Sequence, residues 1–311
     1  MDRILRTLLF VPANSWRMIL SAATEGEDAV ILDLEDACPL AEKETGRIFA
    51  RDAIGTLKRH ELDVFVRVNS FDTGFTEQDL DYVIVDGLDG IMLPKAERAE
   101  DMIRLDALLT NHEARRGLAA QSLAIIALIE SPRGIAAAAE ITSASKRVIA
   151  LGFGAGDYSR ELGIGMGVTS LSPEDRFLMA SHPRACIALA ARAANVLAFD
   201  TPFFGLVIDL DGLVHEAHQA RLVGFTGKLL VYPRHIAPTN QVFSPAAEEL
   251  DLAHKVITAY EEARAKGLGA TSVGGKMIDY GSYRRAASLV AMDERLVAKE
   301  KQRVLAQASP A

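Results

Sequence analysis

Two acidic residues follow neighbouring apolar segments of the chain, and carboxylates in such positions can act as metal ligands. Glu130 comes directly after the apolar segment at residues 123–129, and Asp157 lies in a glycine-rich turn after the next segment, at residues 148–153. Two carboxylates that leave open positions for water and substrate suit Mg²⁺. This ion can polarise a carbonyl or hydroxyl group of a substrate. Glu130 and Asp157 are therefore a candidate Mg²⁺ site.

Arg67 is a cation with apolar neighbours on both sides. Its planar, forked donors match a carboxylate or an enolate-like oxygen of a substrate. The alternative role for Arg67 is a salt bridge to Glu35 or Asp36, which is compatible with substrate binding. Glu130 likewise has an equally favoured alternative, a buried ion pair with Lys95 or Arg67.

Other charged residues end further apolar segments and are candidates to support the site. They are Asp33, Glu35, Asp36, Lys95 and Asp200. If these segments are parallel strands of a barrel, their carboxyl ends meet on the face where barrel enzymes place their chemistry. Charges that share a cavity without partners are costly, and a divalent cation would compensate the acidic ones.

The glycine-rich turn at residues 152–156 leads directly to Asp157. Successive backbone N–H groups in such a turn can form a small concave site for an anion. We predict that the turn, at Gly154 and Ala155, binds a carboxylate of the substrate close to the metal.

The elements that position these residues are short apolar segments separated by longer segments of helical periodicity. The apolar segments are Thr7–Val11, Ala29–Leu34, Val64–Val68, Gly90–Leu93, Leu123–Ile129, Val148–Phe153, Val196–Phe199 and Lys228–Val231. Nearly all are continuous rather than alternating, as expected for parallel strands buried on both faces. The pattern predicts an α/β fold, a (β/α)₈ TIM barrel over residues 1–240. A doubly wound open sheet is the alternative, although no G-x-G-x-x-G motif follows the first segment.

The last part of the chain has a different pattern. A connector rich in Pro, Asn and Ser at residues 238–245 precedes a helical stretch at Glu248–Lys266, and a glycine-rich loop then leads to a final helix at Tyr283–Gln302. We predict that residues 241–311 form a C-terminal helical extension that packs on the barrel or on a neighbouring subunit.

The composition of the 311-residue chain is that of a globular protein, 49% hydrophobic and 24% charged, with a formal net charge of -8. No block rich in Lys and Arg occurs, so no nucleic-acid partner is expected. No stretch approaches the roughly 20 apolar residues that a membrane helix requires. The two cysteines form no CxxC pair, which is typical of free thiols in a reducing compartment. We expect a cytoplasmic protein with no membrane segment.

Seven short motifs occur in order along almost the whole chain. They are Arg6–Pro12, Ala29–Ala37, Val66–Asn69, Leu93–Lys95, Ala127–Glu130, Gly152–Tyr158 and Gly275–Asp279. In this combination the sequence resembles the HpcH/HpaI aldolase/citrate lyase beta-subunit family. Within that family it looks like the citrate-lyase-beta-like branch that includes malyl-CoA and citramalyl-CoA lyases.

The resemblance implies that Glu130 and Asp157 bind Mg²⁺ and that Arg67 contacts the substrate. It also implies that Asp279 reaches the active site of an adjacent subunit in a homotrimer or hexamer. The alternative role for Asp279 is that of an N-terminal residue of the final helix, which needs no chemistry.

Two residues depart from the pattern of the family. Tyr232 stands where many relatives have His, and Gly281 stands where the family commonly has Pro. Glycine in place of proline loosens the turn that positions Asp279. Both departures fall near the part of the chain expected to meet a thioester substrate.

The implied reaction is a Mg²⁺-dependent carbon–carbon cleavage, or its reverse, of a 3-hydroxyacyl thioester such as malyl-CoA, citramalyl-CoA or citryl-CoA. Loss of the hydroxyl proton releases a 2-oxo acid, and the thioester half departs as an enolate stabilised by Arg67. Asp279 is the candidate to protonate that enolate.

Three other enzymatic functions remain open. They are a class II pyruvate aldolase acting on free 2-keto-4-hydroxy acids, a malyl-CoA thioesterase, and the beta subunit of a multi-subunit citrate lyase acting on citryl bound to an acyl-carrier protein. The substrate is accordingly expected to be an acyl-CoA or a small carboxylate. A non-catalytic scaffold leaves the charges at the segment ends unexplained.

Overall fold

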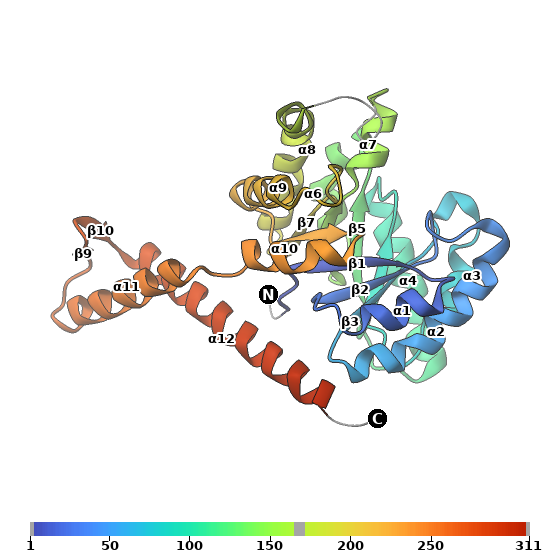
Figure 1. Ribbon diagram of the computed structural model, residues 1–311, viewed down its shortest axis with the longest axis horizontal. Coiled ribbons are helices and arrows are strands. Elements are labelled where there is room, and N and C mark those ends of the chain that lie inside the picture. Colours follow the sequence, from blue (N-terminus) through green and yellow to red (C-terminus); the bar gives the residue numbers. More distant parts are fainter. Residues whose placement is uncertain (1–2, 165–171, 309–311) are drawn as a thin grey trace. The chain divides into compact units, whose positions relative to one another are not determined.

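The computed structural model describes residues 3–164 and 172–308, and its central feature is a closed barrel of eight parallel strands (Figure 1). The strands are β1 (Thr7–Pro12), β2 (Ala29–Asp33), β3 (Asp63–Arg67), β4 (Gly90–Leu93), β5 (Ala124–Ile129), β6 (Val148–Phe153), β7 (Leu197–Asp200) and β8 (Gly227–Leu230). They follow one another in chain order, and β8 pairs with β1 to close the ring. The predicted (β/α)₈ barrel is confirmed, and the doubly wound sheet is excluded because an open sheet leaves two unpaired edges.

Side chains along each strand alternate between two apolar layers. Ile31 and Phe65 belong to the layer that fills the inside of the barrel. Their neighbours Leu32 and Val66 belong to the layer between the strands and the helices. Because both faces are buried, the strands read as continuous apolar segments. The same alternation decides which way a polar residue at the end of a strand points.

Helices cover the outside of the barrel. They are α1 (Trp16–Ala22), α2 (Lys43–Arg59), α3 (Thr76–Val83), α4 (Ala99–Arg116), α5 (Pro132–Ala136), α6 (Ala138–Ser143), α7 (Ala155–Glu161), α8 (Pro173–Ala193), α9 (Leu210–Val223) and α10 (Ile236–Phe243). The sequence locally specifies the start of α5. Pro132 has a backbone angle suited to the first turn, and the Ser131 hydroxyl accepts the Gly134 N–H at 3.1 Å. This cap begins directly after Glu130, which is the first residue beyond β5.

Helix α10 occupies much of the segment that the sequence predicted to be a connector, so that prediction is wrong. Pro238 lies in the first turn of α10, where a helix loses nothing by its missing N–H. Ile236, Thr239 and Val242 are buried at helical spacing. The chain divides into two compact units after this helix, between Phe243 and Ser244.

The second unit contains two helices and a small hairpin. Its elements are α11 (Ala247–Ala265), β9 (Thr271–Val273), β10 (Lys276–Ile278) and α12 (Tyr280–Ala308). The strands β9 and β10 are antiparallel, and the two glycines between them have φ of 55° and 78°. Two positive φ angles fit the two-residue turn that matches the twist of a hairpin. The glycine-rich loop predicted from the sequence is therefore partly an ordered hairpin.

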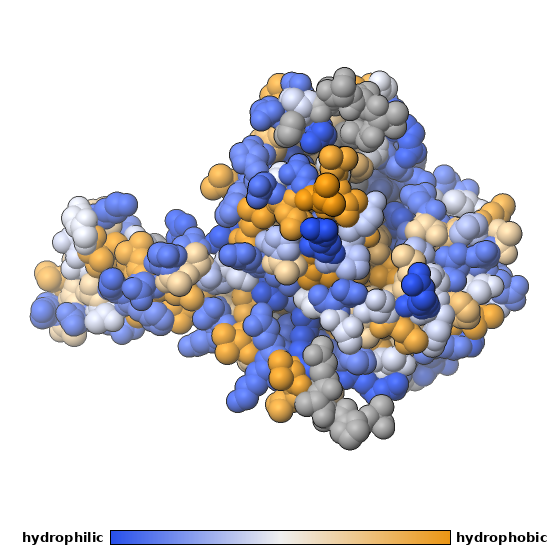
Figure 2. Space-filling model, viewed as in Figure 1, coloured by the Kyte–Doolittle hydropathy of each residue, from blue (hydrophilic) through white to orange (hydrophobic). Residues whose placement is uncertain are grey.

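The surface of the protein contains both hydrophilic and hydrophobic residues. Figure 2 shows hydrophilic residues over most of the face that it presents, with hydrophobic residues among them. Within the part of the chain that the structure describes, no helix has the length and apolar character needed to cross a membrane.

Asp200 corrects one expectation from the sequence. It follows Phe199, whose side chain fills the inside of the barrel, so Asp200 points into the layer between strands and helices. There it is fully buried and accepts hydrogen bonds from Arg184 Nε and Lys228 Nζ, both at 2.7 Å. The same two cations also contact Glu216. These four residues form a structural ion network, and Asp200 does not join the charges that face the barrel interior.

Replacing the anion at the centre of this network should destabilise the barrel. Asp200→Ala would leave Arg184 and Lys228 buried with one carboxylate fewer, which costs about 3–5 kcal/mol. Asp52→Ala is the control, because Asp52 forms an exposed pair with Arg51 and should change stability by about 1 kcal/mol or less. Urea unfolding followed by circular dichroism measures both. Equal effects of the two substitutions would contradict the assignment.

Candidate active site

Asp33, Arg67 and Glu130 point into the same end of the barrel. Each lies two residues beyond a side chain that fills the inside of the barrel, on β2, β3 and β5 respectively. The alternation of side chains along a strand therefore directs all three toward the barrel axis, at the carboxyl ends of the strands. A cavity of about 900 Å³ opens there, and Asp36 and Asp157 also line it.

Arg67 is held by carboxylates and an aromatic ring. Its Nε and Nη2 atoms donate to the two oxygens of Asp33 at 2.7 and 2.5 Å, a bidentate pair, and its Nη1 lies 2.9 Å from Glu35 Oε2. The guanidinium carbon lies 4.8 Å from the centre of the Phe10 ring. Burial lowers the pKa of Arg67, but Asp33, Glu35 and Glu130 outweigh it and raise that pKa above the ordinary value. Arg67 is thus a fixed cation at the edge of the cavity.

Glu130 is a buried carboxylate whose place depends on two neighbours. Its Oε2 accepts the backbone N–H of Lys95 at 3.0 Å, and its side chain is packed against the backbone of Gly154. A Cβ atom at position 154 would lie 2.4 Å from Glu130 Oε1. Any residue other than glycine there would therefore displace the carboxylate.

The surroundings of Glu130 disfavour its negative charge. Burial raises the pKa of Glu130 to about 8; the cationic Arg67 opposes this shift, and the anionic Glu35 and Asp157 add to it. The pKa of Glu35 is also raised, again chiefly by burial. A divalent cation beside Glu130 would reverse this balance by stabilising the ionised form.

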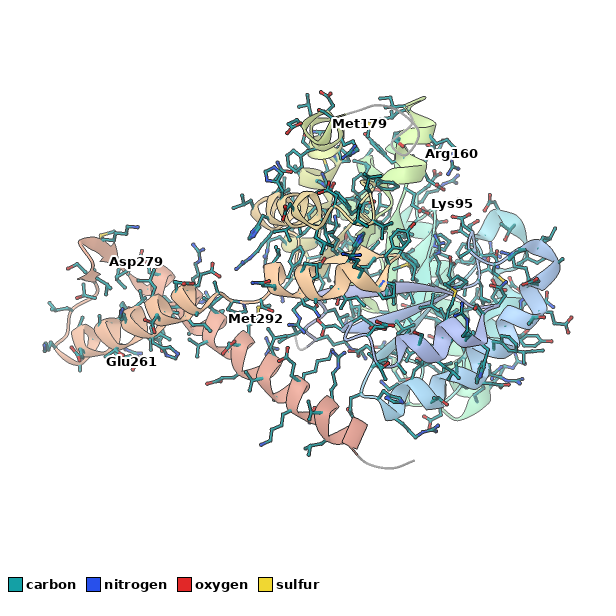
Figure 3. The ribbon with its side chains drawn as sticks, viewed as in Figure 1. Lys95, Arg160, Met179, Glu261, Asp279 and Met292 are labelled. Carbon is teal, nitrogen blue, oxygen red and sulfur yellow. The ribbon has the colours of Figure 1, made fainter. Side chains whose placement is uncertain are left out.

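Lys95 contacts the site through both its backbone and its side chain. Its backbone φ of 51° is in the left-handed region, which costs free energy for a residue with a Cβ atom and often marks functional sites. In this conformation its N–H bonds to Glu130, while its Nζ lies 3.0 Å from Glu35 Oε1. Figure 3 labels Lys95 and Arg160 on the first unit. Lys95 pairs with Glu35 through its ammonium group, where the sequence had suggested a pair with Glu130.

Asp157 lies in the first turn of α7, directly after β6. Its carboxylate forms an ion pair with Arg160, one helical turn further along, and remains partly exposed to the cavity. Arg160 is itself largely exposed. An exposed cation on a long side chain can move away when another cation approaches.

The N–H groups of Gly154 and Ala155 already have partners within the protein. Gly154 donates to the carbonyl of Ile129 at 2.9 Å, and Ala155 donates to the Thr201 hydroxyl at 3.2 Å. These two groups are therefore not the open donors that the sequence analysis expected for a substrate carboxylate. The hydrogen bonds instead hold the turn in place beside Glu130.

The donors at this end of the barrel suit a hard cation that keeps water or substrate as ligands. Glu130 and Asp157 offer carboxylate oxygens, the ligand type that Mg²⁺ prefers. Among residues 3–164 and 172–308, no cluster of three or more His, Cys, Asp or Glu residues with metal-binding geometry is found. Two carboxylates leave positions open for water and substrate, which fits Mg²⁺.

Apolar residues form a wall of the same cavity, and the sequence analysis did not identify it. Its residues come from β1, β6 and the segments after β7 and β8: Phe10, Phe153, Phe203, Phe204, Val231, Tyr232 and Pro233. The ring of Phe204 approaches the backbone at Gly156, next to Asp157. Two aromatic residues directly after the seventh strand were the signal that could have located this wall.

Asp279 belongs to the second unit, at the start of α12 (Figure 3). Its Oδ1 accepts the backbone N–H of Ser282 at 2.8 Å and the Ser282 hydroxyl at 2.9 Å. These bonds are those of a helix N-cap, and they lower the pKa of Asp279. Asp279 therefore has the role that the sequence suggested as the alternative, that of an N-terminal residue of the final helix. A cap of this kind does not preclude a second role in chemistry.

Comparison with known proteins links this geometry to a family. Residues 6–233 match the family model of the HpcH/HpaI aldolase/citrate lyase family. The chain is 37% identical over 278 residues to the citrate lyase subunit beta of Leuconostoc mesenteroides subsp. cremoris, covering 89% of each protein. It is 32% identical over 309 residues to the L-malyl-CoA/beta-methylmalyl-CoA lyase of Cereibacter sphaeroides, covering 94% of this chain and 96% of the relative.

Solved structures give the same grouping. The structure of protein CitE from Mycobacterium tuberculosis in complex with magnesium, acetoacetate and coenzyme A matches with a TM-score of 0.75 and 30% identity, over 94% of this chain and all of that one. A citrate lyase beta subunit from the same organism, complexed with oxaloacetate and magnesium, matches with a TM-score of 0.64 and 32% identity, over 78% of this chain and 98% of that one. The resemblance inferred from the sequence motifs is confirmed: the chain belongs to the HpcH/HpaI aldolase/citrate lyase family and is a carbon–carbon lyase of that family.

Proposed function

We propose that Glu130 and Asp157 bind Mg²⁺, and that the cavity cleaves or forms the carbon–carbon bond of a 3-hydroxyacyl coenzyme A thioester. The observation that carries the proposal is the convergence of both carboxylates and Arg67 on one cavity. The names of the relatives support it, because they include lyases of malyl-CoA and a structure that holds magnesium and coenzyme A. The substrate class is therefore a thioester whose cleavage releases a 2-oxo acid.

Arg67 is the residue suited to stabilise the charge that develops during cleavage. When bound, Mg²⁺ would polarise the oxygens of the substrate and offset the two carboxylates. The hydroxyl group loses its proton to solvent, its oxygen becomes the carbonyl of the 2-oxo acid, and the electron pair of the broken carbon–carbon bond moves onto the thioester half, which becomes an enolate. Asp33 and Glu35 fix Arg67 before any substrate binds, so little reorganisation is needed when it meets this oxygen.

Asp279 is our candidate for the group that exchanges a proton with the carbon of the thioester half: its carboxylate removes that proton in the condensing direction and returns it to the enolate in the cleaving direction. The proposal is that it acts at the cavity of an adjacent subunit in a trimer or hexamer. In the structure its carboxylate caps α12. An Asn at this position would still cap the helix, because Asn is as good an N-cap as Asp, but it has no acidic proton to give.

A second candidate is the beta subunit of a multi-subunit citrate lyase. The observation that favours it is the 37% identity to a protein of that name, compared with 32% to the malyl-CoA lyase. In this case the acyl group would arrive on a carrier protein rather than on coenzyme A. The chemistry of Glu130, Asp157 and Arg67 would be the same.

An activity panel on the purified chain separates the substrate classes. We expect Mg²⁺-dependent conversion of malyl-, citramalyl- or citryl-CoA to acetyl-CoA and a 2-oxo acid, measured by chromatography of both products. Activity only on free 2-keto-4-hydroxy acids would indicate an aldolase. Malate and free coenzyme A without glyoxylate would indicate a thioesterase. Turnover only of a carrier-bound citryl group would indicate the citrate lyase subunit.

Removal of either metal ligand should abolish Mg²⁺ binding and turnover together. Glu130→Gln and Asp157→Asn keep the size of each side chain but remove a charged ligand. We expect calorimetric titration with Mg²⁺ to show no binding at millimolar concentration, and kcat to fall at least about 10³-fold, since the ion supplies several kcal/mol. Glu140→Gln, at an exposed position on α6, is the matched control and should behave as wild type. Wild-type Mg²⁺ affinity in both site variants would refute the assignment.

The role of Asp279 in a neighbouring subunit can be tested by mixing two inactive variants. Asp279→Asn should keep Mg²⁺ binding and lower kcat about 10²- to 10⁴-fold, the usual contribution of a general acid. Co-expression of Asp279→Asn with Glu130→Gln should then restore activity, to about a quarter of the sites in a randomly mixed ring. Mixed assemblies without restored activity would contradict action between subunits.

A further inference from the structure

Lys43 makes three short polar contacts just outside the cavity. It is the first residue of α2, and its side chain reaches back to the loop that follows β2. The ammonium group donates to the carbonyl of Leu34 at 2.5 Å, to the carbonyl of Glu35 at 2.8 Å and to Asn69 Oδ1 at 2.8 Å. All three donors of the ammonium group therefore have an oxygen partner, and two of these oxygens belong to the loop backbone.

Asn69 is in turn fixed by a buried ion pair. Asp79, which is fully buried on α3, accepts both the backbone N–H and the side-chain amide of Asn69, at 2.8 and 2.7 Å. Its other oxygen accepts Arg47 Nε at 2.7 Å. The side chain of Asn69 is thus held with its oxygen toward Lys43. A chain of buried polar groups runs from α2 and α3 to the loop after β2.

That loop carries the carboxylates that organise the cations of the cavity. The Glu35 side chain bridges Arg67 Nη1 and Lys95 Nζ, at 2.9 and 3.0 Å. Asp36, the next residue, lines the cavity and lies 3.6 Å from Arg67. Displacement of the Glu35 backbone would therefore disturb both cations, although Asp33 would still hold Arg67.

We propose that Lys43 is a positioning residue for catalysis, which holds the backbone of Leu34 and Glu35 so that Glu35 orients Arg67 and Lys95. This inference rests on the proposed function, because it assigns catalytic value to the orientation of Arg67. Glu130 is held by the backbone of Lys95 and Gly154 rather than by the Lys95 ammonium group, and Asp157 pairs with Arg160. Loss of Lys43 should therefore impair turnover while it leaves the binding of Mg²⁺ intact.

The test compares two lysines of the same helix. Lys43→Met removes the three donors, whereas Lys58→Met removes the pair of Lys58 with Asp89, which precedes β4 at the opposite end of the barrel. We expect kcat of Lys43→Met to fall about 10- to 100-fold, because a small misplacement of a catalytic group typically lowers the rate by this much. Its Mg²⁺ affinity by calorimetry should remain within about twofold of wild type. Lys58→Met should change neither quantity.

Lys43→Arg provides the conservative variant. It retains a cation and several donors, so it should recover part of the kcat lost in Lys43→Met. Amide hydrogen exchange over residues 34–38 adds a readout that needs no substrate. In the wild-type structure the N–H groups of Glu35 and Ala37 donate to the Asp33 carboxylate, and that of Cys38 donates to the Glu35 carbonyl. These amides should exchange faster in Lys43→Met than in wild type. In Lys58→Met they should exchange at the wild-type rate.

The outcomes separate this inference from the proposed function. Wild-type kcat in Lys43→Met, or unchanged exchange over residues 34–38, would overturn the positioning role. A parallel loss of kcat and Mg²⁺ affinity would also overturn it, because it would indicate general damage to the barrel. If the wild-type chain itself cleaves no thioester of the panel, the proposed function fails, whereas faster exchange over residues 34–38 would still support the hold of Lys43 on the loop.

Discussion

The pair of Arg67 and Asp33 is the interaction on which the arrangement of the cavity depends. The two residues are partners in the register of neighbouring strands and share the inward face of the barrel, so their side chains meet where the strands end. A buried guanidinium needs such a partner, since an unpaired charge at this depth costs several kcal/mol. Once Arg67 is fixed, Glu35 adds a second carboxylate and links it to Lys95. Glu130 interacts with this cluster and with Asp157, and burial disfavours its charge, which a divalent cation would stabilise.

Much of the fold follows from the sequence, because continuous apolar segments and the helices between them leave few alternatives to a barrel. Each of the eight segments overlaps a strand of the structure, with ends that differ by at most one residue. The pairing of Arg67 with Asp33 was harder to foresee. It requires the register between two strands, which periodicity along one strand does not contain. The same holds for Asp200, whose direction depends on whether its neighbour Phe199 faces the inside of the barrel.

The candidate site was predictable in its charges but not in its walls. Carboxylates at the ends of apolar segments stand out in a sequence, since such residues are rarely buried without a reason. Phe203 and Phe204 give a weaker signal, because aromatic residues are equally expected in a core and only their position after the seventh strand sets them apart. The sequence also could not show that the N–H groups of Gly154 and Ala155, expected to be open to a substrate, already have partners. A buried N–H group must find a partner, and Ile129 and Thr201 lie close enough to supply one.

Much of the apolar wall of the cavity comes from other stretches of the chain than its charges do. The carboxylates and Arg67 end or follow β2, β3, β5 and β6, whereas Phe203, Phe204, Val231 and Tyr232 follow β7 and β8. Substitutions in the second group can reshape the space offered to a ligand without touching the ion pairs that make the barrel chemically competent. Such a separation makes the scaffold evolvable. A gene duplicate could acquire a different substrate through changes in two short loops, while selection preserves the carbon–carbon cleavage itself.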